Sequence, residues 1–274
     1  MSKFCIVRNT FGDRSAFLQI SLEYQQEADL ANNFDTYIFI DPHPDYGYDE
    51  EYENNIIINK YKKIVFDSHK ERKSWYAAVD YMFSNFDYDY ILTIEDDVII
   101  SKDYLKICNQ IIDDNFLENN GNLLYFHIGA WEKPKGNPNK IVKSKASSRS
   151  VLINRTKFNV IKDFARINSC DFNKGNDNII RDILESKQML TIAPEYNRHG
   201  HFGVYGWSSF GVKRDISGKK DLFKNMDYNE VYKLLKSNCL KKEGLLKLNL
   251  NRSPRYFWDF DPNIYYENLI YPKL

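Results

Sequence analysis

Three consecutive acidic residues, Glu95-Asp96-Asp97, follow the apolar run Tyr90-Ile91-Leu92-Thr93-Ile94. Adjacent carboxylates that are largely withdrawn from water repel one another and lose hydration, unless a cation neutralises them. Hard oxygen ligands suit Mg²⁺ or Mn²⁺, which retain water ligands and are completed by substrate phosphates. The alternative is that Asp96 and Asp97 only start a turn and complement the dipole of the next helix. The triplet thus indicates either metal-assisted chemistry on a phosphate-containing substrate or a structural turn.

Sequence motifs that other nucleotide-dependent enzymes use to bind phosphate are missing. The chain contains no GxxxxGK[ST] loop, which argues against phosphoryl transfer. The residues that follow the first apolar run, Val7-Arg8-Asn9-Thr10-Phe11-Gly12, do not form the dinucleotide fingerprint GxGxxG. A metal that stabilises a leaving diphosphate fits these observations better. This chemistry is that of sugar transfer from a nucleotide sugar.

The elements around the triplet predict an α/β fold. Short apolar runs indicate buried strands at Phe4–Val7, Thr36–Ile40, Lys63–Phe66, Tyr90–Ile94 and Leu123–Ile128. Helical spacing separates them at Arg14 to Asn32, Glu71 to Phe86 and Ser101 to Asn115, the last helix being capped by Ser101. Strands joined by helices predict a mostly parallel central sheet flanked by helices on both faces. Ligands of such sheets bind at the carboxyl ends of the strands, where the triplet lies.

The second half of the chain continues the α/β pattern beyond a polar loop at Glu132 to Lys140. We expect strands at Ser150–Ile153 and Met189–Ala193, and helices at Lys157–Ile167, Asn176–Lys187 and Asn225 to Leu240. One catalytic domain is therefore predicted over residues 1–224, with a nucleotide-sugar-binding half at 1–131 and an acceptor-binding half at 141–224. Residues 225–274 are expected to form a helical and aromatic extension packed on the same domain.

Composition and charge narrow the classes of partner. The 274 residues include 38 basic and 38 acidic side chains, so the chain lacks the positive field that drives nucleic-acid binding. No stretch approaches the roughly 20 apolar residues of a membrane-spanning helix, and the N-terminal apolar segment is shorter than that of a secretory signal. The four cysteines form no CxxC pair. We expect a soluble, cytoplasmic protein without a nucleic-acid partner or a transmembrane segment.

Several blocks of the chain resemble motifs of one known enzyme family, in the same order. Ile94-Glu95-Asp96-Asp97-Val98 resembles the strand-terminal Glu-Asp-Asp-Leu motif of that family, and Ile128-Gly129-Ala130-Trp131 its Ser-Ala-Trp segment. Asn176-Asp177-Asn178-Ile179-Ile180-Arg181 is similar to its Trp-Asp-x-Trp-Met-Arg motif. Pro194-Glu195-Tyr196-Asn197-Arg198, with Phe202-Gly203, Gly206 and Ser208, resembles its Pro-Glu-x-x-Arg…Phe-Gly…Gly-x-Ser loop. The shared order covers Phe4 to Gly211. The family that these blocks resemble is that of the metal-dependent, inverting glycosyltransferases of the GT-A fold related to animal N-acetylglucosaminyltransferase I.

The resemblance implies a UDP-sugar donor, a glycan or polysaccharide acceptor and a divalent metal. Asp97 would be the direct ligand of Mn²⁺ or Mg²⁺, with Asp96 facing the ribose and Glu95 supporting both. Ser208 would donate a hydrogen bond to a phosphate when its glycine-containing loop closes.

Further residues are implied at the nucleotide base. Asp41 would accept a hydrogen bond from the uracil ring, and His69 would lie at the nucleotide. Taken by itself, His69 is more typical of a solvated histidine at the start of a helix. Arg8 matches the arginine that contacts the base, and Arg14 is the competing choice.

Asp177 is the candidate for the chemical step. Inversion at an anomeric carbon requires one carboxylate opposite the leaving group, which accepts the proton of the attacking hydroxyl. Because Asp177 opens a predicted helix, it is also a candidate helix cap. A carboxylate can serve in both roles.

Departures from the family fall near the acceptor and the transferred sugar. Asn176 and Ile179 replace the two tryptophans of the family motif. Uridine diphosphate as the carrier is therefore better supported than N-acetylglucosamine as the transferred sugar. Trp131, Tyr205 and Trp207 are aromatic candidates for the sugar pocket. The chain also shows no anchor or stem of the kind that animal Golgi enzymes carry, which favours a bacterial or viral origin.

Two other classes of protein remain open. A carbohydrate-binding module on a degenerate transferase fold would use the surplus of 20 Tyr, 18 Phe and 4 Trp as a recognition surface. Codon drift in an AT-rich genome also produces such a surplus. The other class is a metal-dependent nucleotidyltransferase, which the absent glycine-rich loop disfavours. The presence of both the acidic triplet and Asp177 favours an active glycosyltransferase over the binding module.

Overall fold

The computed structural model describes residues 3–12, 14–42, 47–66, 75–129, 136–144, 150–170, 176–202, 226–240 and 261–274. Its main sheet has eight strands in the order β3-β2-β1-β4-β8-β6-β9-β7. These strands are β1 (Phe4–Phe11), β2 (Asp35–Asp41), β3 (Lys62–Val65), β4 (Tyr90–Glu95), β6 (Leu123–His127), β7 (Ile141–Ser144), β8 (Ser150–Asn154) and β9 (Leu190–Pro194). A second, two-stranded sheet pairs β5 (Val98–Ile100) with β10 (His199–His201).

Most strands of the main sheet run in the same direction. The pairs β3/β2, β2/β1, β1/β4 and β6/β9 are parallel, whereas β8 is antiparallel to both β4 and β6, and β7 is antiparallel to β9. Because β8 reverses direction between them, β4 and β6 point the same way and end at the same edge. The mostly parallel α/β sheet predicted from the sequence is therefore confirmed.

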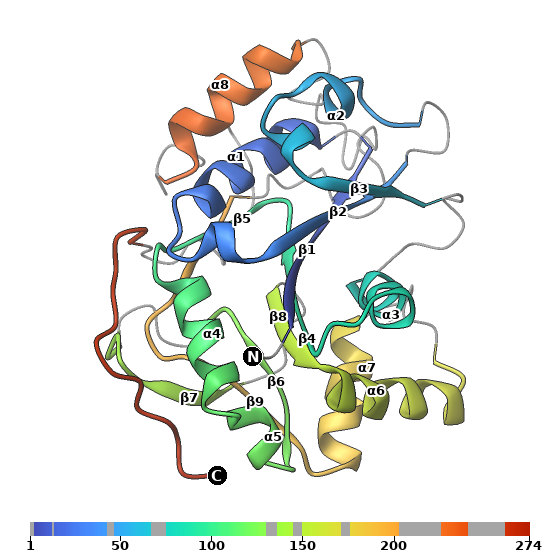
Figure 1. The fold of residues 1–274 in the computed structure, drawn as a ribbon, viewed down its shortest axis with the longest axis vertical. Coiled ribbons are helices and arrows are strands. Elements are labelled where there is room, and N and C mark those ends of the chain that lie inside the picture. Colours follow the sequence, from blue (N-terminus) through green and yellow to red (C-terminus); the bar gives the residue numbers. More distant parts are fainter. Residues whose placement is uncertain are drawn as a thin grey trace, which may run out of the picture.

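Helices cover both faces of this sheet. They are α1 (Ser15–Gln26), α2 (Glu51–Asn54), α3 (Trp75–Asn85), α4 (Tyr104–Asp113), α5 (Phe116–Asn119), α6 (Arg155–Ile167), α7 (Asn176–Ser186) and α8 (Tyr228–Asn238), with 3₁₀ turns η1 (Ala31–Asn33) and η2 (Ile58–Lys60). Helices α3, α6 and α7 lie on one side, and α1 and α4 lie on the other (Figure 1). Within the described ranges, no helix combines the length and apolarity that crossing a bilayer requires.

Strand β1 shows how one element serves both cores. Cys5 and Val7 are buried in the cluster that contains α3, α6 and α7, whereas Phe4 and Ile6 are buried in the cluster that contains α4. Successive side chains of a strand point to opposite faces. A strand segment with helices on both sides is therefore a continuous apolar run, as the first four residues of β1 are, and such a run can be detected in the sequence.

The start of α4 differs from the sequence prediction. The helix begins at Tyr104 and its N-cap position is Asp103, so the predicted cap at Ser101 is wrong. The hydroxyl of Ser101 instead donates to Asp103 Oδ1 at 2.7 Å, and Arg198 forms an ion pair with the same carboxylate. This buried cluster holds residues 101–103 in a turn, which delays the helix.

The described C-terminal residues pack against the rest of the fold. Helix α8 packs on α1, and its start carries a capping box between Asp227 and Glu230. Further on, Ile141 N donates to Ile270 O at 2.8 Å, and the Tyr271 ring stacks on Phe116 at 4.0 Å between centroids. The division of the chain into catalytic halves and an extension stays a prediction.

Candidate functional site

The acidic triplet lies at the carboxyl end of β4, between β1 and β8 in the middle of the sheet. Glu95 is the last residue of β4, and Asp96 and Asp97 form the turn that leads into β5. Asp96 and Asp97 are only 3% and 7% exposed, whereas Glu95 is half-buried. Buried carboxylates of this kind require compensation by positive charge or by hydrogen bonds.

Arg14 supplies part of this compensation. Its Nη2 atom lies 3.0 Å from Asp96 Oδ1 and 2.6 Å from Asp97 Oδ2. Burial alone would lower the pKa of Arg14, but the charges of Asp96 and Asp97 outweigh it and raise that pKa. The guanidinium is therefore charged when it faces the two carboxylates.

His201 approaches the same carboxylates from another part of the chain. Its Nε2 atom lies 3.3 Å from Asp97 Oδ1 and 4.0 Å from Glu95 Oε2. Strand β10 places it there, because β10 pairs antiparallel with β5 and sets His201 opposite Val98. The next residue, Phe202, donates its N–H to the carbonyl oxygen of Asp97 at 3.0 Å.

Glu95, Asp97 and His201 together fit a divalent cation. One ligand atom of each residue lies within 4.8 Å of the others. Two carboxylate oxygens suit Mn²⁺ or Mg²⁺, and an imidazole nitrogen is a ligand more typical of transition metals. The resemblance named Asp97 as the ligand; it did not point to His201, whose only signal in the sequence was its place directly before the Phe202-Gly203 block.

Asp97 is negatively charged in this arrangement. Burial by itself would raise the pKa of the Asp97 carboxyl, but the nearby charges of His201 and Arg14 more than compensate and hold that pKa well below its ordinary range. A carboxylate that is ionised before a cation arrives needs no proton release to become a ligand.

Asp96 faces the interior of the protein. Its Oδ2 atom accepts a hydrogen bond from Thr10 Oγ1 at 2.8 Å, and its Oδ1 atom contacts Arg14. Thr10 is itself within 2.8 Å of the hydroxyl of Tyr52. A ribose would have to displace these partners to reach Asp96. The observed contacts therefore fit a supporting role for Asp96 rather than the predicted ribose contact.

Arg8 lies beneath the site. It is 0% exposed, its Nε atom donates to Gln25 Oε1 at 2.8 Å, and its Nη1 atom donates to the carbonyl oxygens of Glu95 and Val98 at 3.2 Å each. An arginine held inside the fold in this way cannot contact a nucleotide base, so we correct this assignment. Arg14, the competing choice, is the arginine that lies at the triplet.

Asp41 ends β2 at the same edge of the sheet as the triplet. It pairs with Phe11 in the register between β2 and β1, while Asn9 of β1 pairs with Glu95 on the other side. Asp41 is 4% exposed, and its carbonyl oxygen accepts a hydrogen bond from Gly12 N at 2.8 Å. The topology thus brings Asp41 and the triplet to one edge, with β1 between them.

The remaining predicted site residues belong to the parts of the chain that the structure does not describe, or have side chains that it does not describe. Five of them lie outside the described residues: His69, Trp131, Tyr205, Trp207 and Ser208. Asn176 and Asp177 form the first turn of α7, but their side chains are not described.

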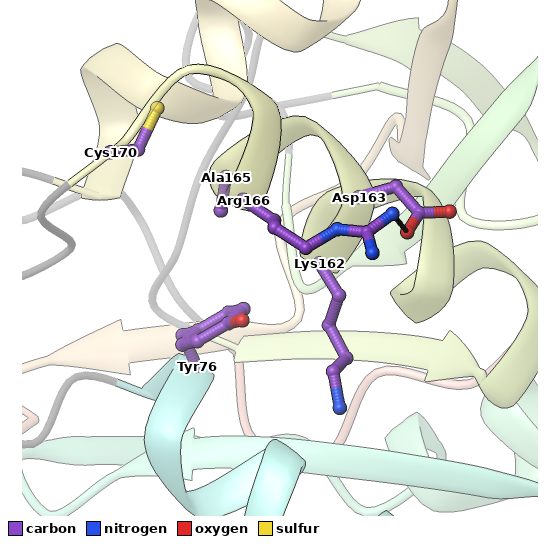
Figure 2. A pocket seen from close by; sticks show the side chains of 6 residues that line it. All are labelled: Tyr76, Lys162, Asp163, Ala165, Arg166 and Cys170. Carbon is purple, nitrogen blue, oxygen red and sulfur yellow. Dashed lines mark hydrogen bonds and ion pairs between the residues drawn. The ribbon is translucent and has the colours of Figure 1, made fainter.

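A separate pocket lies between α3 and the C-terminal part of α6. It has a volume of about 420 Å³, and its described lining residues are Tyr76, Lys162, Asp163, Ala165, Arg166 and Cys170 (Figure 2). Lys162 forms an ion pair with Asp80 at 2.6 Å, and Arg166 forms one with Asp163 at 3.1 Å. The charged groups of this pocket thus compensate one another, and none of its described lining residues belongs to the predicted site.

Comparisons with known proteins give structural likenesses only. No protein-family model and no curated protein matches the chain. Among solved structures, a putative nucleotide-diphospho-sugar transferase from Desulfovibrio desulfuricans G20 has 14% identity and a TM-score of 0.44, over 90% of this chain and 99% of that one. S. aureus TarS 1-349 has 12% identity and a TM-score of 0.44, over 72% of this chain and 59% of that one. CMP:2-keto-3-deoxy-manno-octonic acid synthetase, solved with CTP, has 10% identity and a TM-score of 0.43, over 73% of this chain and 92% of that one.

These likenesses are too distant to assign an activity. The chain spans little more than half of the TarS structure, at 59% of its length. The function therefore has to be argued from the site itself.

Proposed function

We propose that the protein is a metal-dependent, inverting glycosyltransferase of the GT-A type, which moves a sugar from a UDP-sugar to a hydroxyl group of a glycan acceptor. The observation that carries the proposal is the meeting of Glu95, Asp97 and His201 at the carboxyl end of β4. Ligand sites of open α/β sheets lie at this edge. A cation held there would face the phosphates of a donor.

Asp97 and His201 would hold the divalent cation, and Glu95 would complete the set. The bound cation would supply positive charge that stabilises the diphosphate as it leaves. Arg14 would support the ligand Asp97 directly, because its guanidinium contacts the Asp97 carboxylate. Asp96 would help to hold Arg14 in place, because the same guanidinium contacts Asp96. Asp41 and His69 are proposed at the uracil ring and the nucleotide, and Ser208 is proposed at a phosphate.

Asp177 is proposed as the general base. The oxygen of the acceptor hydroxyl attacks the anomeric carbon, its proton passes to the Asp177 carboxylate, and the bond from that carbon to the diphosphate oxygen breaks with its electron pair. Such a positioned base contributes on the order of 10²–10⁴-fold to the rate. Asn176, Trp131, Tyr205 and Trp207 are proposed to shape the pocket for the acceptor and the transferred sugar.

The direct test is release of UDP from a panel of UDP-sugars, with Mn²⁺ and with a chelator. We expect release from at least one donor with Mn²⁺ only, and a loss of roughly 10²-fold or more in kcat for Asp177→Asn. Full activity of Asp177→Asn would show that the assigned base is wrong. Pyrophosphate release from a nucleoside triphosphate, with no UDP release, would favour a nucleotidyltransferase. Sugar binding without turnover of any donor would favour a binding module.

A further inference from the structure

Arg14 has an unusual place at the proposed metal site. One atom, Nη2, contacts Asp96 Oδ1 at 3.0 Å and Asp97 Oδ2 at 2.6 Å. The other oxygen of Asp97, Oδ1, lies 3.3 Å from His201 Nε2. The two oxygens of the Asp97 carboxylate are thus divided between an arginine on one side and the candidate metal ligands on the other.

We infer that Arg14 is a positioning residue that turns Asp97 Oδ1 toward His201 and Glu95, and that its charge holds the buried carboxylates together until a divalent cation binds. This inference rests on the proposed function for the identity of the cation. Its first part, the compensation of Asp96 and Asp97 by Arg14, concerns the metal-free protein and can be tested separately.

The charges at the turn explain why such a residue is needed. Glu95, Asp96 and Asp97 carry three negative charges in sequence, and the last two are buried. Removal of one partner of a buried ion pair is strongly destabilising because it leaves an uncompensated charge. Without Arg14, Asp96 and Asp97 would repel each other and draw water into the turn between β4 and β5.

A series of side-chain contacts connects Arg14 to the residue directly after strand β10, which carries His201. The guanidinium carbon of Arg14 lies 4.8 Å from the centroid of the Phe17 ring, and Phe17 stacks on Phe202 at 5.7 Å with an angle of 17°. Phe202 in turn donates its N–H to the carbonyl oxygen of Asp97 at 3.0 Å. Arg14 therefore contacts Asp97 directly. Through the ring of Phe17 it also supports Phe202, the residue that follows His201.

Arg14 and the cation would act on opposite oxygens of one carboxylate, so their charges partly substitute for one another. Loss of Arg14 then lowers the thermal stability of the protein more in the absence of the cation than in its presence. A purely structural arginine would give the same loss in both conditions. Arg155 provides this control, because its guanidinium donates to the backbone oxygens of Phe83, Phe86 and Tyr88 and contacts none of the acidic triplet.

The experiment is thermal unfolding of the full chain in EDTA and in saturating Mn²⁺, with Mn²⁺ binding measured by calorimetry. We expect Arg14→Gln to lower the melting temperature by roughly 10 °C in EDTA, with Mn²⁺ restoring more than half of the loss. Arg155→Gln is expected to lose the same amount in both conditions. Arg14→Lys, which keeps the charge, is expected to retain the Mn²⁺-induced shift of the unchanged protein. Equal Mn²⁺-induced shifts in Arg14→Gln, Arg155→Gln and the unchanged protein would overturn the inference.

A double variant covers the case in which Arg14→Gln does not fold in EDTA. Asp96→Asn removes the surplus charge, so we expect Arg14→Gln with Asp96→Asn to fold and to recover most of the lost stability. Failure of this rescue would overturn the charge role of Arg14, whether or not metal binds. If the unchanged protein binds no Mn²⁺ while the rescue succeeds, the proposed metal-dependent function fails and the compensation by Arg14 stands.

Discussion

At the scale of single residues, the carboxylate of Asp97 is the centre of the site. Arg14 contacts one oxygen of this carboxylate and His201 contacts the other. The backbone carbonyl oxygen of Asp97 accepts a hydrogen bond from Phe202 N–H. Each contact comes from a different element. The same short turn therefore determines both the stability of this edge of the sheet and its capacity to hold a cation.

Acid should weaken the protein through this residue. The pKa of Asp97 is held below its ordinary value of about 3.9 by the charges of His201 and Arg14. A carboxyl whose native pKa is depressed stabilises the fold fully above the unfolded pKa, and this contribution is lost as the pH falls below it. We predict that urea unfolding free energy drops by roughly 2 kcal/mol more in the unchanged protein than in Asp97→Asn between pH 5 and pH 2. Equal drops would contradict the assignment.

At the scale of elements, the sequence predicted the parts of the fold that have a local pattern. Seven of the eight strands of the central sheet and helices α1, α3, α4, α6, α7 and α8 follow from apolar runs and helical spacing, with ends that differ by up to six residues. Strand β7, which has only four residues, was not predicted from the sequence. Strands β5 and β10 have only three residues each and no periodicity to detect. Their pairing joins distant parts of the chain, and this pairing is what brings His201 to Asp97.

The length of strand β1 explains the error at Arg8. Arg8 and Arg14 both follow the first apolar residues of the chain, and motif spacing could not separate them. Strand β1 continues to Phe11, so Arg8 lies inside the sheet, whereas Arg14 lies beyond its carboxyl end. The length of a strand, which local propensity fixes poorly, decided which arginine reaches the site.

Gly129 shows how closely β10 packs on the end of β6. A Cβ atom at this position would collide with Asn197 Oδ1 and would lie 3.1 Å from His199 Nδ1. Asn197 cannot yield freely, because it is buried and its Nδ2 donates to the carbonyl oxygen of His199 at 2.7 Å.

We predict that Gly129→Ala destabilises the protein by about 1–3 kcal/mol and weakens Mn²⁺ binding by displacing β10. Gly121→Ala is the matched control, because nothing lies within 4 Å of a Cβ there. Its unfolding free energy should stay within about 0.5 kcal/mol of the unchanged protein. Chemical unfolding and calorimetry measure both effects. Normal Mn²⁺ affinity in Gly129→Ala would show that β10 does not depend on this contact.

At the scale of the whole molecule, the sheet brings the described candidate residues Asp41, Asp96 and Asp97 to one edge. Strands β1, β2 and β4 are parallel, so Asp41, Arg14 and the acidic triplet all lie at or just beyond the carboxyl ends of strands. Strand β8 runs antiparallel to β4 and is followed in the chain by α6. Helix α7, whose first turn contains Asp177, comes next. The candidate metal site draws on both halves of the chain, because Glu95 and Asp97 come from the first half and His201 from the second. The division into a donor half and an acceptor half stays a prediction.

The central claim is that Asp97 holds a cation that a uridine nucleotide needs for binding. Calorimetric titration of UDP into the protein, with Mn²⁺ and with EDTA, tests this claim most directly, with Asp97→Asn as the variant and the exposed Asp163→Asn as its control. We predict that UDP binds the unchanged protein and Asp163→Asn with Mn²⁺ present, and that binding weakens by at least tenfold in EDTA and in Asp97→Asn. No detectable UDP binding to the unchanged protein with Mn²⁺, or equal binding in Asp97→Asn, would contradict the claim.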